Sequence, residues 1–418
     1  MLSIINNTVT KLVDSILLGK NFNPLLITAF SLYYIPPEYA LPEGVYLAWQ
    51  FSLCLVSLAS FVLYVTKREI SRPWIFATCA FVLYYAVSKV ANASDGTWAS
   101  VVFMLLRGVG FISLAGYCMK VDFRKTIEAL LTASVVMCAV HYATFLLYGG
   151  VYGGMRAGYV ETQFSSRPTN QHWLFLSHDN GSVFYFLPML ALLWFYILAF
   201  RRKMLPVGVM VSIASIYMYV SLWSATAMVS TIFLCFGSVL LFAINKDRTW
   251  SSAICVSAGL LGLIGCLVVV FLNVNGLFES VAVLLGKSGT ANSRALIWQK
   301  AIAEFARKPL FGVGYELNET SFLRLGINHC HNIIIQILYT GGISSLSCFV
   351  AALLSVFPKK KIQTASIVFG VYMLAFFLSA TFDWYLYMTI AFAPFVVMYG
   401  YEKYGDPRTS GGRNHVTC

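Results

Sequence analysis

The chain has 418 residues, of which 59% are hydrophobic and 11% are charged, and its formal net charge is +12. Soluble globular proteins carry roughly 25% charged residues, so this composition excludes an ordinary soluble domain. The positive charge lies in short clusters between apolar segments. We therefore expect the chain to reside in a lipid bilayer, and we expect no nucleic acid among its partners.

Apolar segments recur along the whole sequence with a length of about 20 residues, which a helix needs to cross a hydrocarbon core of ~30 Å. We predict an all-α polytopic membrane protein, with a single integral-membrane domain over residues 1–418 and about twelve transmembrane helices. The first is the weakest, because Pro36 and Pro37 interrupt it near its outer end. The predicted spans are 22–40, 44–66, 73–90, 99–119, 126–149, 181–200, 204–222, 226–244, 251–275, 332–356, 364–382 and 386–402.

Clusters of lysine and arginine fall between alternate spans, and such clusters are typical of cytoplasmic loops. When every cluster is placed in the cytoplasm, the spans alternate without conflict and both termini are cytoplasmic. The clusters are Lys67-Arg68 with Arg72, Lys120 with Arg124-Lys125, Arg201-Arg202-Lys203, Lys246 with Arg248, Lys359-Lys360-Lys361, and Lys403 with Arg408 and Arg413.

Two long segments between spans are then extracytoplasmic: a first loop at 150–180 and a larger loop at 276–331. Long loops in compact proteins are usually functional. Both carry cations on the outer side, against the usual bias, with Arg156 and Arg167 in the first loop and Arg294 in the second. This distribution favours an anionic ligand at the outer face.

The larger loop contains an amphipathic helix, "NSRALIWQKAIAEFAR", at 292–307, with Asn292 or Ser293 as its N-cap. The turn "KPLFGVG" that follows ends the helix. Two interpretations stay open: a helix with its apolar face on the membrane interface, or a helix that packs on the rest of the protein. The expected apolar stripe consists of Trp298, Ala301, Ile302 and Phe305.

Charges within the predicted spans are rare. All seventeen acidic residues fall in loops or at the ends of spans, whereas ion-coupled transporters usually keep an acid near the membrane midplane. Arg107 is the one charge clearly inside a span, where it is either a ligand-binding residue or a side chain that reaches to the interface.

Two histidines, His329 and His331, stand where the span at 332–356 begins. A histidine at this place can act as a general base, bind a metal ion or merely start a helix. Residues at i and i+2 do not share a helix face, and no other candidate ligand lies near them in the sequence. We therefore predict no metal and no other cofactor, while the base and the polar helix start both stay open.

A combination of motifs surrounds these histidines. Arg294 and Trp298 precede the turn Pro-Leu-Phe-Gly-Val-Gly at 309–314, and the pair His331-Asn332 is followed by nine residues and Gly342. This arrangement resembles the bacterial family of O-antigen ligases and of O-antigen and capsular polysaccharide polymerases.

Two positions depart from the family pattern. Ser345 stands where the family has Gly, Thr or Tyr, and Ala225 in "SATA" stands where relatives often have arginine. One phosphate-binding charge is thus missing, and we expect Arg107, Arg156 or Arg167 to replace it.

The resemblance implies a metal-independent glycosyl transfer at the outer face of the bacterial cytoplasmic membrane. The donor is a glycan on undecaprenyl diphosphate, and the acceptor is the hydroxyl of a second glycan. His331 is the expected general base, and Arg294 with Arg156 is expected to bind the diphosphate. Asn332 is expected to orient the histidine or bind sugar, and His329 to share in substrate binding.

We prefer a polymerase of oligosaccharide repeat units, working beside a flippase and a chain-length regulator. An O-antigen ligase, which moves the glycan onto lipid A-core, is the alternative within the family. A non-enzymatic transporter of polysaccharide or lipid carrier is the alternative from another class, and it would need no general base.

Overall fold

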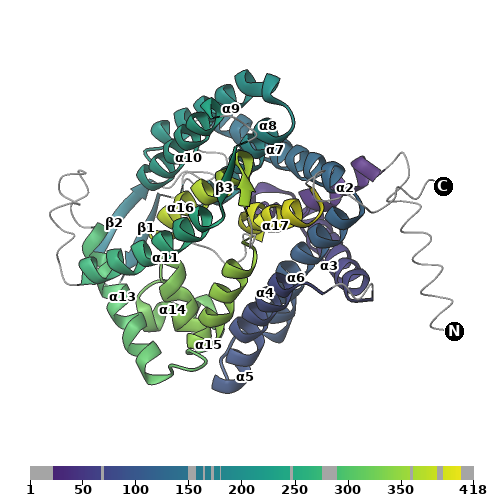
Figure 1. Ribbon diagram of the computed structural model, residues 1–418. Coiled ribbons are helices and arrows are strands. Elements are labelled where there is room, and N and C mark those ends of the chain that lie inside the picture. Colours follow the sequence, from purple (N-terminus) through teal and green to yellow (C-terminus); the bar gives the residue numbers. More distant parts are fainter. Residues whose placement is uncertain are drawn as a thin grey trace.

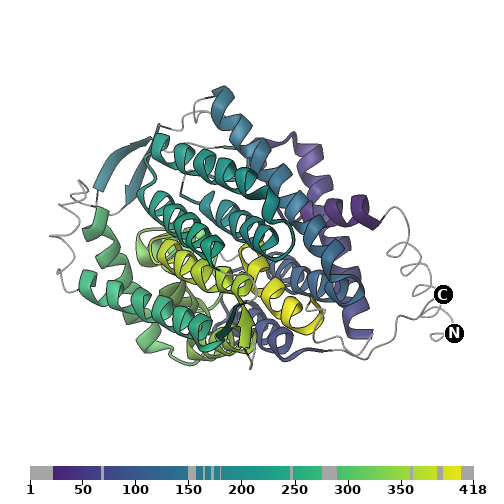
Figure 2. The same ribbon diagram turned by 45° about the horizontal axis from the view of Figure 1, so that its top comes forward.

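The computed structural model describes residues 22–66, 70–148, 157–162, 165–170, 174–178, 180–244, 248–274, 290–357, 361–383 and 389–405, and the structural statements below concern these residues. Nearly all of its elements are helices that run side by side in one bundle (Figures 1 and 2). The helices are α2 (Phe22–Ser31), α3 (Glu43–Thr66), α4 (Arg72–Val82), η2 (Leu83–Val87), α5 (Ser88–Asn92), α6 (Trp98–Val121), α7 (Phe123–Tyr148), α8 (Val183–Ala199), α9 (Leu205–Ser221), α10 (Ala225–Ala243), α11 (Ala253–Val274), α13 (Thr290–Arg307), α14 (Asn318–Leu325), α15 (Ile333–Ser355), α16 (Ile367–Ala380) and α17 (Ala393–Gly400).

Eight helical segments in this part of the chain are long and apolar enough to cross a membrane, and α8 and α16 are shorter apolar helices. The prediction of an all-α polytopic membrane protein is therefore confirmed, while the number of twelve spans stays a prediction. The first predicted span differs in form: α2 ends at Ser31, and a short 3₁₀ turn at Glu38–Ala40 follows Pro36 and Pro37. Prolines lack the N–H that would continue the helix.

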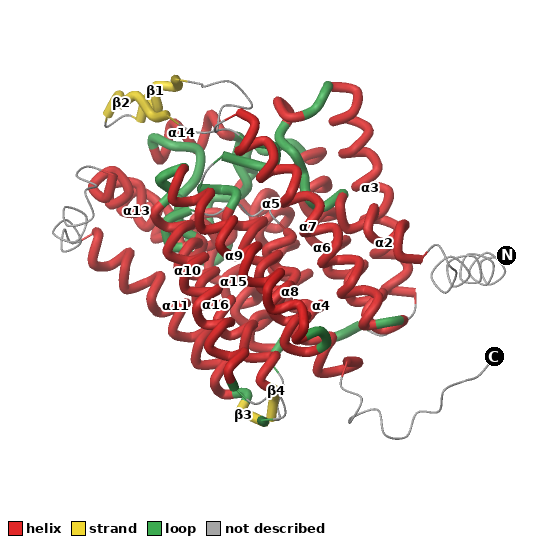
Figure 3. Tube along the Cα trace, turned by 90° about the horizontal axis from the view of Figure 1, so that it is seen from above, coloured by secondary structure: helices red, strands yellow, loops and turns green. Residues whose placement is uncertain are grey.

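The basic segments at Arg202, Arg248 and Lys361 gather at one face of the bundle. Arg202 donates from Nη2 to the carbonyls of Phe242 (3.3 Å) and Ile244 (3.0 Å). Strand β3 (Thr249–Ser251) pairs with β4 (Lys361–Gln363), which joins the segment before α11 to the segment after α15. The β3–β4 pair and the hairpin of β1 (Ala157–Thr162) and β2 (Ser165–Asn170) lie at opposite ends of the bundle (Figure 3).

It follows that the end of α11 and the start of α15 lie at the face away from the basic clusters, together with α13 and α14. This is the arrangement that the predicted topology requires. Which side of a membrane each face meets stays a prediction.

Helix α13 packs on the bundle through part of its predicted stripe. Trp298 and Ala301 are buried in one cluster with Ile335 and Tyr339 of α15. The structure thus supports the packing interpretation of this helix. Ile302 of the same stripe is exposed and takes no part in this packing.

The turn at 309–314 packs against a break in α15. At Gly342 the backbone leaves the helix with φ 68° and ψ −170°. The N–H of Val313 donates to the carbonyl of Tyr339 (2.7 Å), and the N–H of Ile343 donates to the carbonyl of Pro309 (2.9 Å). A Cβ on Gly342 would lie 2.4 Å from the carbonyl oxygen of Leu310. The glycine nine residues after the His-Asn pair is therefore the point where the turn docks.

Candidate active site

His331 stands directly before α15, in a backbone conformation that side chains rarely adopt. Its φ is 49°, in the left-handed region, where residues other than glycine are uncommon and mark strained or functional positions. Its side chain is 19% exposed, so the ring is enclosed but still reaches solvent. The chain is thus held in an unfavourable conformation at the residue that the sequence analysis places as the base.

The next residue, Asn332, holds this part of the backbone in place through its side chain. Its Oδ1 accepts the N–H groups of Ile334 (2.9 Å) and Ile335 (3.1 Å) and so caps α15. Its Nδ2 donates to the carbonyl of Thr381, 3.1 Å away, at the end of α16. The side chain is fully buried. These contacts support the orienting role predicted for Asn332, and they bring the segment after α16 against the start of α15.

Asp383 follows two residues after Thr381 and lies between two histidines. Its Oδ1 is 3.4 Å from Nδ1 of His331, and its Oδ2 is 3.5 Å from Nε2 of His178. Although burial opposes its ionisation, contacts with His178 and His331 outweigh this and hold the pKa of Asp383 well below its usual range. The site therefore holds a buried carboxylate beside the predicted base.

His329 packs against His331, with ring centroids 4.0 Å apart. Its Nδ1 accepts the backbone N–H of His331, 3.2 Å away. The surrounding protein disfavours a charged ring, and together with the neighbouring His331 this lowers the pKa of His329 well below its usual value. His329 is thus kept neutral and supports the backbone of His331.

His178 reaches the site from the segment between β2 and α8. Nδ1 of His141, which is fully buried in α7, accepts the N–H of Leu176 at 3.0 Å. This contact fixes the segment two residues before His178. Helices α7, α15 and α16 therefore all take part in placing the group of three histidines and one carboxylate.

Arg294 is brought to the same place by its helix. Trp298, one turn later on the same side of α13, donates from Nε1 to the carbonyl of Cys330 at 2.7 Å. This hydrogen bond attaches α13 to the residue between His329 and His331. The guanidinium of Arg294 lies 5.6 Å from the ring centroid of Phe382, next to Asp383.

A small cavity of about 240 Å³, including the part open to solvent, lies between Arg294 and Asp383, and none of the three histidines lines it. It is lined by Asn180, Val183, Thr226, Ala227, Arg294, Ser379, Phe382 and Asp383. The hydroxyl of Ser224 donates to Oδ1 of Asn180 at 2.6 Å, which ties the start of α10 to the start of α8. Arg294 therefore lies beside the segment 224–227, where Ala225 replaces the arginine of the family pattern.

Arg107, Arg156 and Arg167 were predicted to replace the missing phosphate-binding charge. Within the described part of the chain, none of them lines this cavity. Arg107 is buried in α6, with its guanidinium 5.9 Å from the ring centroid of Phe103, and it does not line the cavity. Arg156 lies outside the described residues. The backbone of Arg167 lies in β2 opposite Val160, and its side chain is not described.

One group of side chains in the described part of the chain has the spacing of metal ligands. The nitrogen atoms of His329 and His331 and a carboxylate oxygen of Asp383 lie within 4.8 Å of one another. Two imidazoles and a carboxylate form a donor set that zinc uses in catalytic sites. The geometry therefore admits a divalent cation where the sequence analysis predicted none, and the prediction stays to be tested.

Sequence reasoning missed Asp383 and His178. Asp383 is separated from His331 by 52 positions and follows the predicted span 364–382, so no local spacing relates the two residues. A signal for His178 was present, because "LSHDNGSVFYFLP" stands between a polar loop and an apolar span. Only the contact between the start of α15 and the end of α16 places Asp383 at the site, and only the approach of His178 to Asp383 shows that this histidine belongs there too.

Residues 222–350 match the family model of O-antigen ligase. The resemblance predicted from the sequence is confirmed by this match, which includes Arg294, Trp298, the turn at 309–314, His331 and Gly342. No curated protein matches the chain. Over this segment the chain is similar to O-antigen ligases, and its long apolar helices are those of a multi-pass membrane protein. The match ends before Asp383, and His178 and Asn180 precede it.

Proposed function

We propose that the protein is a membrane glycosyltransferase whose donor is a glycan on a polyprenyl diphosphate. One observation carries the proposal: the carboxylate of Asp383, which contacts His331, lines the same cavity as Arg294. The carboxylate that contacts the expected base and a cation thus line one small cavity, at the face of the bundle away from the basic clusters. A base and a cation are both needed when a weak nucleophile displaces a diphosphate.

The residues support a direct displacement. Nδ1 of His331 lies 3.4 Å from the carboxylate of Asp383, whose negative charge favours a proton on Nδ1 and leaves the lone pair of Nε2 for the acceptor hydroxyl. As Nε2 takes the proton, the sugar oxygen bonds to the anomeric carbon and the bond from that carbon to the diphosphate breaks. The diphosphate leaves with the electron pair, and Arg294 stabilises its charge. Asp383 stabilises the imidazolium that forms.

The test of the base compares two neighbouring histidines. His331→Ala should slow glycan transfer about 10²- to 10⁴-fold, the usual cost of a lost general base. His329→Ala should be milder, because His329 supports the backbone of His331 rather than facing Asp383. The assay is transfer by the purified protein in proteoliposomes, at matched protein levels. An inactive His329→Ala beside an active His331→Ala would refute the assignment, and a wild-type protein that catalyses no transfer would favour the transporter.

A chelator distinguishes two roles of His331: a general base that works without metal, and a ligand of a metal ion that activates water. If the group of His329, His331 and Asp383 works without a metal, dialysis against EDTA should leave the rate unchanged. Loss of activity on dialysis, with recovery on adding zinc or manganese, would show that these residues hold a catalytic cation and that His331 is its ligand.

We further propose that the acceptor is the glycan of another lipid-linked repeat unit, so that the enzyme is a polymerase of the bacterial cytoplasmic membrane. Ala225, which stands where relatives often have arginine, supports a polymerase over a ligase. The loss of this cation fits a subfamily in which the positions of the phosphate-binding cations vary. Analysis of surface glycans and carrier lipids in a deletion strain tests it. Single repeat units on the surface indicate a lost polymerase, and long glycans left on the carrier indicate a lost ligase.

A further inference from the structure

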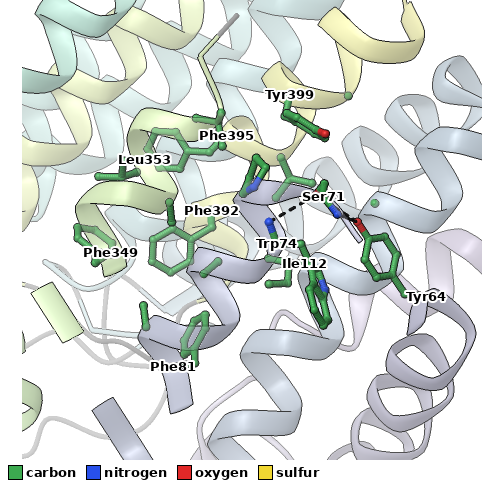
Figure 4. Close-up of a pocket in the computed structure, with 18 of the residues that line it drawn as sticks. Tyr64, Ser71, Trp74, Phe81, Ile112, Phe349, Leu353, Phe392, Phe395 and Tyr399 are labelled. Atoms are coloured by element: carbon green, nitrogen blue, oxygen red, sulfur yellow. Dashed lines mark hydrogen bonds between the residues drawn. The ribbon is translucent and has the colours of Figure 1, made fainter. Parts of the chain in front are cut away.

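A long apolar groove runs through the bundle, and its lining shares no residue with the cavity at Arg294. It is bounded by α4, α6, α15 and α17, and its volume is about 1050 Å³, including the part open to the surroundings. Phe349 and Leu353 of α15 lie on one side of this space, and Trp74 and Ile112 face them from α4 and α6 (Figure 4).

The walls of the groove leave little polar surface for a ligand. The indole N–H of Trp74 donates to Ser113 at 2.9 Å, and the hydroxyl of Ser345 donates to the carbonyl of Ala80 at 3.2 Å. The hydroxyl of Tyr64 donates to Ser71 at 3.2 Å. Because these polar groups are satisfied within the protein, the groove suits a hydrocarbon and not a polar ligand.

The groove extends over more than one leaflet. Its lining begins at Ser71, at the face of the basic clusters, and continues along α4 to Tyr84 in η2. Thirteen residues at a rise of 1.5 Å cover about 20 Å, whereas half of a hydrocarbon core of ~30 Å is about 15 Å. A groove of this length crosses the midplane, which an acyl chain anchored in either leaflet does not need to do.

The upper end of the groove lies directly beneath the histidines. Tyr84 accepts a hydrogen bond from Nε2 of Gln336 at 3.3 Å. The Oε1 of the same glutamine accepts the N–H of Cys330 at 2.7 Å, between His329 and His331. Gln336 thus stands between the histidines and this end of the groove, whose other end lies at the opposite face of the bundle.

We propose that this groove binds the polyprenyl chain of a lipid-linked substrate whose diphosphate and glycan lie at the His331 site. The proposal rests on the proposed function for the identity of the head group. The occupant is a single hydrocarbon chain longer than a phospholipid acyl chain, because the groove continues past the midplane and its upper end adjoins the site.

The first experiment measures binding without catalysis. Undecaprenyl phosphate with a photoactivatable group near the end of its chain is added to the protein in phosphatidylglycerol nanodiscs, irradiated, and mapped by peptide mass spectrometry. Crosslinks should fall on α4, α15 and α17, and unlabelled undecaprenyl phosphate should compete with them. Crosslinks confined to lipid-facing surfaces such as α3, or competition by added phospholipid alone, would overturn the proposal.

The second experiment uses chain length. The same glycan diphosphate is offered on an undecaprenyl chain and on a farnesyl chain. Ala77→Trp on α4 and Ala352→Trp on α15 fill the groove from its two walls, and Ala59→Trp on the exposed face of α3 is the matched control. Wild type and control should show a KM lower by about tenfold or more for the long chain, since each buried methylene adds to affinity.

The groove variants should lose this preference. Their KM for the undecaprenyl substrate should rise to that of the farnesyl substrate, while kcat and KM for the farnesyl substrate stay unchanged and show that the site is intact. A preference that survives in both variants would overturn the groove. A wild-type protein that transfers neither substrate, yet gives competed crosslinks in the groove, would refute the proposed function and leave the lipid site standing.

Discussion

Asp383→Asn removes one negative charge beside His331 and changes the shape of the side chain very little. At 3.4 Å, two unit charges interact by about 5 kcal/mol at an effective dielectric constant of about 20. Because His331 reaches solvent and asparagine still offers a carbonyl oxygen, we take about half of this value as the stabilisation lost in the transition state. A loss of about 2–3 kcal/mol corresponds to transfer that is roughly 30- to 160-fold slower.

The assay is the initial rate of glycan transfer in proteoliposomes at neutral pH, with protein levels matched by immunoblot. Asp95→Asn is the control, because Asp95 stands outside the cavity and accepts the N–H of Leu317 at 3.2 Å. This control should stay within about threefold of wild type. The double variant with His331→Ala should be no slower than His331→Ala alone, since Asp383 acts through that ring.

Two results would refute this reasoning. An Asp383→Asn protein within about threefold of wild type would mean that no charge develops on His331 during the reaction. Independent, multiplicative losses in the double variant would mean that Asp383 acts on the substrate directly and not through the histidine.

Three further predictions concern the cation, the turn and the topology. Arg294→Ala should slow transfer by about 10²-fold or more, and Arg294→Lys should recover only part, because lysine lacks the bidentate fork; a lysine variant equal to wild type would contradict a bidentate contact. Gly342→Ala should cost about 2–5 kcal/mol and lower the unfolding temperature in detergent, since its φ is positive and a Cβ would lie 2.4 Å from a carbonyl oxygen. Gly265→Ala, with nothing within 4 Å, should not lower it, and equal losses would contradict the docking of the turn. In a cysteine-free background, a cysteine at the exposed Ala303 should react with an impermeant reagent in intact spheroplasts and one at Ser251 only after lysis, and the reverse would overturn the topology.

The class of fold and the stretch that carries the family motifs could be predicted from the sequence because both depend on local composition. A run of apolar residues long enough to cross a bilayer forms a helix wherever it stands in the chain, since the lipid offers no other partner for the backbone. Lysine and arginine between the runs predicted which loops share a face, and the pairing of β3 with β4 agrees with this for the segments around α11 and α15. The motifs around Arg294, Trp298 and His331 lie within one stretch that local reading could recognise.

The residues that meet at the site could not be predicted from local sequence. His178, Asp383 and Arg294 come from three distant segments. Their contacts depend on the hydrogen bond that Asn332 donates to the carbonyl of Thr381 and on the one that Trp298 donates to the carbonyl of Cys330. The sequence by itself determined a helical membrane protein with a histidine directly before one of its spans. Only the tertiary structure decided which carboxylate stands behind that histidine, because contacts between helix ends depend on packing and not on distance along the chain.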